Sequence, residues 1–224
     1  MLIEGAFMKI PEVLDYYGDE HYLYEPSISH LFSNSIILEL NARNIDNPLN
    51  KLLFEKRYNP LVNKRCDIYC YFDFLNDNLY NYGYYRENFI EVKYFGNLDK
   101  RKGTETKSEN AGRIMCDIHR LTMGTKEIDK KGLYSLVIFD DHPSKYLAFS
   151  RANGIKRKWI ETILTTGVHK LEFNLKEEPK TIKDIFKADY FYEEDLRIEE
   201  NIRVTSFSPV EKNEGYYGYL IQII

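Results

Sequence analysis

Two carboxylates and a lysine are the residues of this sequence whose types and spacing best suit chemistry. Asp67 lies in a strand-like alternation of polar and apolar residues, and Glu91 and Lys93 lie in a second one. The two-residue period of a strand puts Glu91 and Lys93 on the same face. If the two runs form an antiparallel hairpin centred on residue 79, Asp67 lies opposite Glu91, with about 5 Å between their Cβ atoms.

Such a pair of carboxylates would favour a bound cation, because two negative charges at that distance repel each other. Mg²⁺ prefers oxygen ligands of this kind. The ion could polarise a phosphate and help to make hydroxide from water, and Lys93 could hold that water or stabilise the charge that develops on phosphorus. The acidic-x-Lys pattern occurs four times in the chain, so a surface ion pair between Glu91 and Lys93 remains an open alternative.

The segments around these residues have recognisable helix and strand patterns. The expected helices are 28–43, 49–58, 109–123, 155–164 and 180–187, and the expected strands are 64–74, 88–95, 133–140, 145–150 and 168–175. Ser108 is expected to cap the helix that follows it, and 145–150 to form a hairpin with 133–140. The alternation after residue 64 places Cys66 and Ile68 together, on the face opposite Asp67. The last stretch of the chain is expected to be rich in β-structure.

A family resemblance follows from the order of these features. Asp67, and then Glu91-Val92-Lys93 on the next strand, come after a helix and before a helix and a strand. This arrangement resembles the PD-(D/E)xK nuclease superfamily, which includes many restriction endonucleases and Holliday-junction resolvases. The resemblance covers roughly residues 28–150, and its specificity comes from the order and placement of a short motif.

The resemblance implies a role for each of these residues. Asp67 and Glu91 would be the metal ligands, Lys93 would be the catalytic lysine, and the ion would be Mg²⁺, with Mn²⁺ as a substitute. Cys66 stands where the name of the motif has a proline, which members of the family often lack. Many members add an acidic residue from the first helix to the catalytic group, and Glu39 is the residue expected to do so here.

Glu39 is expected in this role because it lies at the edge of the apolar stripe of the helix over 28–43. An acid in that position needs a partner, since unpaired burial is costly. The alternative is an ion pair with Arg43 at i+4, which would give Glu39 a purely structural role. Glu25 and Glu55 are weaker candidates for the same role.

The fold implied by the resemblance is α+β, with a restriction endonuclease-like mixed sheet flanked by helices. We expect residues 1–150 to form the nuclease core, including an N-terminal helical segment. Residues 151–224 would form an α+β extension that serves DNA contacts or dimerisation. No linker marks the join, so one continuous domain is the open alternative.

Several basic and aromatic residues are candidates for contacts with nucleic acid. Phosphate contacts of this kind position a duplex without reading its sequence. The expected ones are Lys100, Arg101, Lys102 and Arg113, with a solvated loop or a surface charge as the open alternative. Further candidates, for which a solvated surface or ordinary packing is the open alternative, are Arg120, Lys156, Arg157, Lys158 and Trp159, together with the stacking candidates Tyr80, Tyr82, Tyr84 and Tyr85.

The predicted function is a Mg²⁺-dependent DNA endonuclease that resembles type II restriction enzymes. It would hydrolyse phosphodiester bonds of double-stranded DNA with a metal-activated water, as a homodimer. A Holliday-junction resolvase or repair nuclease would share this chemistry. A non-catalytic α+β module that binds protein or nucleic acid is the alternative from a different class.

The composition is compatible with this prediction and excludes other classes. The 224 residues are 43% hydrophobic and 29% charged, which is ordinary for a globular protein. A net charge of −4 argues against a simple polycation that coats nucleic acid. No apolar run reaches the roughly 18 residues of a membrane helix, the first residues lack a secretory pattern, and three cysteines are too few for a disulfide framework. A cytoplasmic location is therefore expected.

Overall fold

Seven strands of a computed structural model form one mixed sheet in the order β1-β2-β3-β4-β7-β6-β5. The structure describes residues 1–17, 23–58, 63–75, 79, 84–96, 106–209 and 215–224. The strands are β1 (Leu52–Arg57), β2 (Arg65–Tyr71), β3 (Glu87–Phe95), β4 (Lys131–Phe139), β5 (Gly167–Asn174), β6 (Arg197–Phe207) and β7 (Tyr217–Ile223). The α-helices are α1 (Leu2–Phe7), α2 (Ile10–Tyr17), α3 (Glu25–Ala42), α4 (Lys107–Gly124), α5 (Lys158–Ile163) and α6 (Lys180–Lys187).

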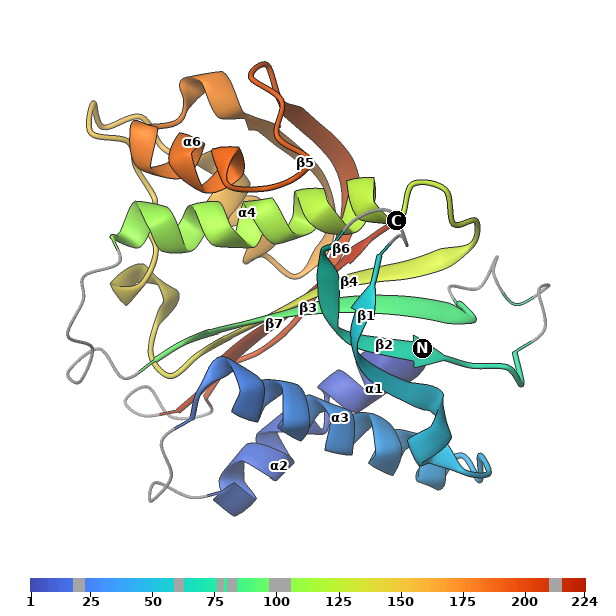
Figure 1. Ribbon diagram of the computed structural model, residues 1–224. Coiled ribbons are helices and arrows are strands. Elements are labelled where there is room, and N and C mark those ends of the chain that lie inside the picture. Colours follow the sequence, from blue (N-terminus) through green and yellow to red (C-terminus); the bar gives the residue numbers. More distant parts are fainter. Residues whose placement is uncertain (18–22, 59–62, 76–78, 80–83, 97–105, 210–214) are drawn as a thin grey trace.

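The sheet separates two layers of helices. Helices α1, α2 and α3 lie on one face, and α4 and α6 lie on the other (Figure 1). Strands β3 and β4 are parallel and are joined by α4, whereas every other neighbouring pair is antiparallel. A parallel pair needs a crossover of this kind, because the chain leaves the first strand at one end of the pair and must enter the second strand at the opposite end. The mixed sheet and its flanking helices confirm the predicted α+β class.

Strand β3 contributes to both layers through its alternation. Ile90 and Val92 are buried in the core on the side of α3, and Phe89 and Phe95 are buried in the core on the side of α4. This is the alternation that the sequence predicts. The apolar stripe predicted for the helix over 109–123 is also confirmed, since Ala111, Ile114, Met115, Ile118 and Leu121 of α4 are all fully buried. Glu91 and Lys93 therefore lie on the face of β3 that α4 covers.

The helix expected over 49–58 is wrong. Pro48–Lys51 forms one 3₁₀ turn, and Leu52–Arg57 then forms β1 along the edge of the sheet. Asn47, just before the turn, has a left-handed backbone conformation (φ 52°), so the chain changes direction there. Because β1 is an edge strand with side chains exposed on both sides, its sequence carries no alternation to identify it.

The hairpin expected between 133–140 and 145–150 is also wrong. Pro143–Lys145 is a 3₁₀ turn, and the position beside β4 belongs to β7, which pairs with it from Leu133–Ile223 to Phe139–Tyr217. The predicted cap of α4 is displaced as well. Thr106, not Ser108, is the N-cap, and it exchanges hydrogen bonds with Glu109 in a capping box.

Residues 151–224 continue the sheet of the first 150 residues. Strand β7 lies between β4 and β6, so the sheet has no break at the join. Trp159 of α5 and Ile182 and Phe186 of α6 belong to the same buried core as the apolar face of α4. Within the described residues, no helix combines the length and the apolar character needed to cross a bilayer.

Replacing Gly124 should destabilise the fold, because this glycine allows α4 to approach Tyr58. A Cβ atom at position 124 would lie 2.8 Å from Cγ and 2.9 Å from Cβ of Tyr58. We expect Gly124→Ala to lower the free energy of unfolding by about 1–3 kcal/mol in chemical denaturation, as overpacking does elsewhere. Thr122→Ala on the same helix is the control and should change it by less than about 1 kcal/mol. Equal stability of the two variants would contradict the close approach.

Candidate functional site

The candidate site lies where β2 separates from β3. The two strands pair from Tyr71–Glu87 to Ile68–Ile90, and pairing then stops. Continuing this register by one residue aligns Asp67 with Glu91, which confirms the predicted hairpin centre at residue 79. Beyond the last pair, Oδ2 of Asp67 accepts a hydrogen bond from the backbone N–H of Val92 at 2.7 Å. The side chain of Asp67 thus takes the place of a ladder bond.

The backbone opposite Asp67 is irregular. Strand β1 pairs Phe54 with Ile68 and Lys56 with Cys66, but it leaves out Glu55, whose φ is 56°. A positive φ is uncommon for a residue other than glycine. The distortion also explains why Cys66 packs in the core on the α4 side while Ile68 packs on the other side, so the predicted common face of these two residues is wrong. Glu55 stays outside the site contacts.

Glu91 is a deeply buried acid. Its side chain is 2% exposed, and its Oε1 accepts hydrogen bonds from the hydroxyl of Tyr58 and, at 3.3 Å, from Nη1 of Arg120. Burial raises the pKa of Glu91 well above its ordinary value, and the neighbouring Asp117 and Asp67 raise it further. The nearby cations offset only part of this effect.

Lys93 is held between carboxylates from both helical layers. Its Nζ lies 3.1 Å from Oε1 of Glu25, 3.2 Å from Oδ2 of Asp117 and 3.0 Å from the carbonyl of Val92. Burial lowers the pKa of the Lys93 ammonium, but the surrounding carboxylates, Asp117 and Glu25 foremost, raise it by more. Lys93 therefore remains an ammonium group, which supplies positive charge and hydrogen bonds and does not act as a base.

Helix α4 contributes Asp117 and Arg120, three residues apart on the face that covers β3. Nη1 of Arg120 lies 3.1 Å from Oδ1 of Asp117, and Nη2 lies 2.9 Å from Oδ2 of Asp189, which follows α6. Burial raises the pKa of Asp117, and Lys93 and Arg120 offset part of that effect. Sequence reasoning missed Asp117, although an acid three residues from Ile114 in a buried stripe was a signal that could have identified it.

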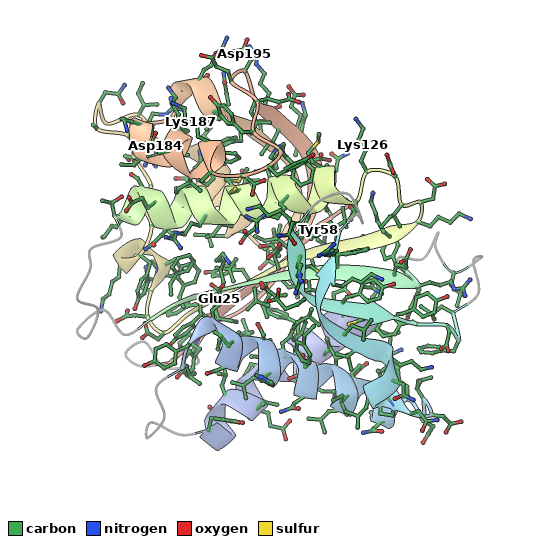
Figure 2. All side chains as sticks on the ribbon, viewed as in Figure 1. Glu25, Tyr58, Lys126, Asp184, Lys187 and Asp195 are labelled. Atoms are coloured by element: carbon green, nitrogen blue, oxygen red, sulfur yellow. The ribbon has the colours of Figure 1, made fainter. Side chains whose placement is uncertain are left out.

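The acid that α3 brings to the site is Glu25, not Glu39. Glu25 begins the helix, and its Oε1 lies 3.1 Å from Nζ of Lys93. Figure 2 labels Glu25 at the start of α3. Glu39 lies fourteen residues later, about 21 Å along the helix axis. Its carboxylate pairs with Arg43 at 2.7 Å and with Lys9 at 3.5 Å. The structural alternative considered for Glu39 is the one observed, and the weaker candidate Glu25 is the residue near Lys93.

A pocket of about 320 Å³ opens beside Lys93, Asp117 and Arg120. It is lined by Lys64, Lys93, Arg113, Cys116, Asp117, Arg120, Ile185, Ala188 and Asp189. The predicted contact residue Arg113 is exposed at this pocket, and the pocket adds Lys64, which the sequence did not single out. Lys100, Arg101 and Lys102 lie outside the described residues, as do Tyr80 and Tyr82.

The basic segment at the start of α5 is only partly available to a ligand. Arg157 is 2% exposed and pairs with Glu178 at 2.8 Å, and the indole of Trp159 donates to the same carboxylate at 3.1 Å. Nucleic-acid contacts by Arg157 and Trp159 are therefore wrong, because both side chains are used inside the fold. Lys156 and Lys158 are exposed.

No family model, curated protein or solved structure matches this chain. The likeness to PD-(D/E)xK nucleases therefore depends on the residues and their arrangement alone. Glu91 and Lys93 lie on the face of β3 that α4 covers, and Asp67 lies on the adjacent strand, where it accepts the N–H of Val92. A helix precedes these residues, and a helix and a strand follow them. Asp117, Arg120 and Glu25 complete the group of charged side chains around them.

The fit to a divalent cation can be tested against the charges and donors of the site. Across the described ranges, no three Asp, Glu, His or Cys side chains stand assembled around a common metal position. In the part of the chain that the structure describes, five carboxylates lie at the site and its pocket with four cations: Glu25, Asp67, Glu91, Asp117 and Asp189 with Lys64, Lys93, Arg113 and Arg120. Oδ2 of Asp117 is buried without a well-formed hydrogen bond. Carboxylate oxygens are the ligand type that a hard divalent ion takes.

Glu91→Gln should stabilise the protein more at high pH than at low pH. A raised pKa means that the folded state holds the proton more tightly, so the stability that Glu91 contributes at low pH is lost as the pH rises through the folded pKa. The amide of glutamine keeps an acceptor for Tyr58 and Arg120. In metal-free buffer we expect a gain of about 1–2 kcal/mol at pH 8 that shrinks toward pH 5, measured by urea denaturation.

The control for this prediction is Glu161→Gln, which changes a glutamate that is 48% exposed. It should show no comparable dependence on pH. A Glu91→Gln variant that is less stable than the wild type by the same amount at every pH would show that Glu91 is fully neutralised by its partners.

Proposed function

We propose that this protein is a DNA endonuclease that uses a divalent metal ion, Mg²⁺ or Mn²⁺, to hydrolyse phosphodiester bonds in the cytoplasm. The observation that carries the proposal is the placement of Asp67, Glu91 and Lys93 where β2 leaves β3, beside a pocket with basic side chains at its walls. This is the residue set that the resemblance to PD-(D/E)xK nucleases assigns to metal and catalysis. The mixed sheet and the crossover helix α4 provide the framework.

Asp67 and Glu91 are the residues that would hold the ion. When bound, the ion would polarise the scissile phosphate and lower the pKa of an attacking water. The negative charge of Glu91 is poorly compensated in the site. Burial and two neighbouring carboxylates disfavour that charge and so raise the pKa of Glu91. Asp67 is held in place by the N–H of Val92, so its carboxylate has one fixed oxygen.

Lys93 supplies positive charge to the reaction. Its raised pKa keeps it an ammonium, which can donate to the attacking water and to the phosphate oxygen on which charge develops. Glu25 lies 3.1 Å from its Nζ and fixes its direction from the α3 side. In this role Glu25 is the acid of the preceding helix that the resemblance leads us to expect.

The walls of the pocket indicate a phosphate-bearing substrate. Lys64 and Arg113 lie at the pocket with Lys93 and Arg120, so four cationic side chains line it against Asp117 and Asp189. Cationic side chains at the wall would hold phosphates next to the scissile one and position the strand without reading its sequence. Double-stranded DNA is the proposed substrate, a 5′-phosphate is the product that the resemblance implies, and a homodimer would cut both strands.

Lys93→Ala should remove metal-dependent cleavage. We expect at least about a 100-fold loss in the rate at which supercoiled plasmid is nicked or linearised in Mg²⁺ or Mn²⁺, because the charge that stabilises the reacting phosphate is lost. Lys126→Ala, which removes an exposed lysine just after α4, is the control and should cut like the wild type. Absence of cleavage by the wild type on plasmid, linear and branched DNA would favour the non-catalytic binding module.

Two glutamates of α3 provide a matched test of the site boundary. We expect Glu25→Gln to slow cleavage about tenfold or more, since Lys93 loses the carboxylate that orients it. Glu39→Gln should leave the rate within about twofold, because its partners Arg43 and Lys9 lie outside the site. The reverse order of the two effects in the same plasmid assay would assign the helix acid to Glu39.

A further inference from the structure

Arg120 is the residue on which three buried carboxylates converge. Its Nη1 donates to Glu91 at 3.3 Å and to Asp117 at 3.1 Å, while its Nε and Nη2 both approach Oδ2 of Asp189, at 3.0 and 2.9 Å. The guanidinium group thus binds the site with one edge and Asp189 with the other. Its planar fork of donors suits two partners at once.

Arg120 is shared unequally between these partners. The contacts with Asp189 are shorter than the contact with Glu91, although the side chains of both acids are 2% exposed. Burial by itself raises the pKa of Asp189, but Arg120 and the N–H of Phe191 lower it by more, so it lies below its ordinary value. Arg120 makes two contacts with Asp189, at 3.0 and 2.9 Å, and one with Glu91, at 3.3 Å, so Asp189 holds it more closely.

Asp189 is fixed independently of Arg120. Its Oδ1 accepts the backbone N–H of Phe191 at 3.1 Å, and Nζ of Lys64 lies 4.0 Å from Oδ2. The residue belongs to the stretch after α6, in residues 151–224, and reaches the α4 side of the sheet because α6 packs on α4. A carboxylate held in this way can keep Arg120 at a constant distance from β3.

We propose that Asp189 is a positioning residue of the metal site, because its hold on Arg120 keeps that side chain from binding Glu91 firmly and leaves Glu91 available to a divalent cation. The inference rests on the proposed function for the existence of the metal site. Arg120 and the cation compete for the same carboxylate, and Asp189 sets the strength of that competition. Removing Asp189 and removing Arg120 then have opposite effects on metal affinity, whereas damage to the fold would weaken binding in both cases.

The test is the affinity of the purified full chain for Mn²⁺ and Ca²⁺, measured by isothermal titration calorimetry at pH 7.5. Asp189→Asn should weaken binding about tenfold, since Arg120 then turns to Glu91 and Asp117. Arg120→Gln should tighten binding about tenfold, since the competing charge is gone. In the Arg120→Gln background, Asp189→Asn should have little further effect, because Asp189 acts through Arg120.

Asp184→Asn is the matched control, because Asp184 lies on α6 (Figure 2), five residues before Asp189 in the sequence, and pairs with the exposed Lys180. It should leave the affinity unchanged, and Asp189→Glu should restore most of what Asp189→Asn loses. If Arg120→Gln fails to fold by circular dichroism, Arg120→Lys replaces it. A lysine cannot hold both partners in the same fork, so Asp189→Asn should then weaken binding less than it does in the wild type.

Three results would overturn the inference. The first is an equal loss from Asp189→Asn in both backgrounds, which would mean that Asp189 acts by its charge alone. The second is weaker binding in Arg120→Gln, and the third is a wild type that binds no divalent cation. DNA cleavage is scored separately. If Asp189→Asn and Arg120→Gln shift the affinity in opposite directions but the wild type cuts no DNA, the nuclease proposal is rejected and the inference stands. If the wild type cuts DNA, Lys93→Ala does not, and the two affinities do not shift in opposite directions, the nuclease proposal stands and the inference is rejected.

Discussion

Buried carboxylates that lie close together need positive charge between them, and this requirement governs the centre of the structure. The buried Asp117 and Asp189, together with Glu25, which is 41% exposed, alternate with Lys93 and Arg120 in one chain of contacts of 3.2 Å or less. Removing a buried partner from such a group leaves an uncompensated charge out of water, which typically costs about 3–5 kcal/mol. The chain links α3, β3, α4 and the stretch after α6, so the parts of the fold are held by the same charges that make the site.

The sheet explains how charges from distant parts of the sequence meet. Strand β3 is buried between two helical layers, so a polar residue on it is unavoidably close to a helix. The early end of the β2–β3 pairing leaves the end of β3 that carries Lys93 without β2 beside it. Glu25 reaches Lys93 there from the opposite helical layer, while α4 covers the same residues from its own side. If β2 had continued to pair with β3 as far as Lys93, it would lie between Lys93 and the helical layer that carries Glu25.

The features that could be predicted from sequence are those that local patterns encode. The β2–β3 register followed from two alternations and a turn-rich connection, and the buried face of α4 followed from its 3.6-residue period. Strand β1 could not be predicted, because an edge strand exposed on both faces has no period. The neighbour of β4 could not be predicted either, since β7 pairs with it across more than 70 residues of sequence. Non-local packing of this kind also brings Tyr58 and Asp189 to the site, and no sequence pattern near either residue predicts their contacts there.

The position of β7 has a consequence for how the protein is made. Residues 217–223 form the last strand of the sequence, yet they lie between β4 and β6 in the middle of the sheet. While a ribosome is still adding these residues, β4 lacks its second neighbour and β5 and β6 have no sheet to join. Long-range pairing of this kind is slow, because loop closure precedes the contacts that reward it. Strand β7 therefore completes the sheet only after every other strand has been synthesised.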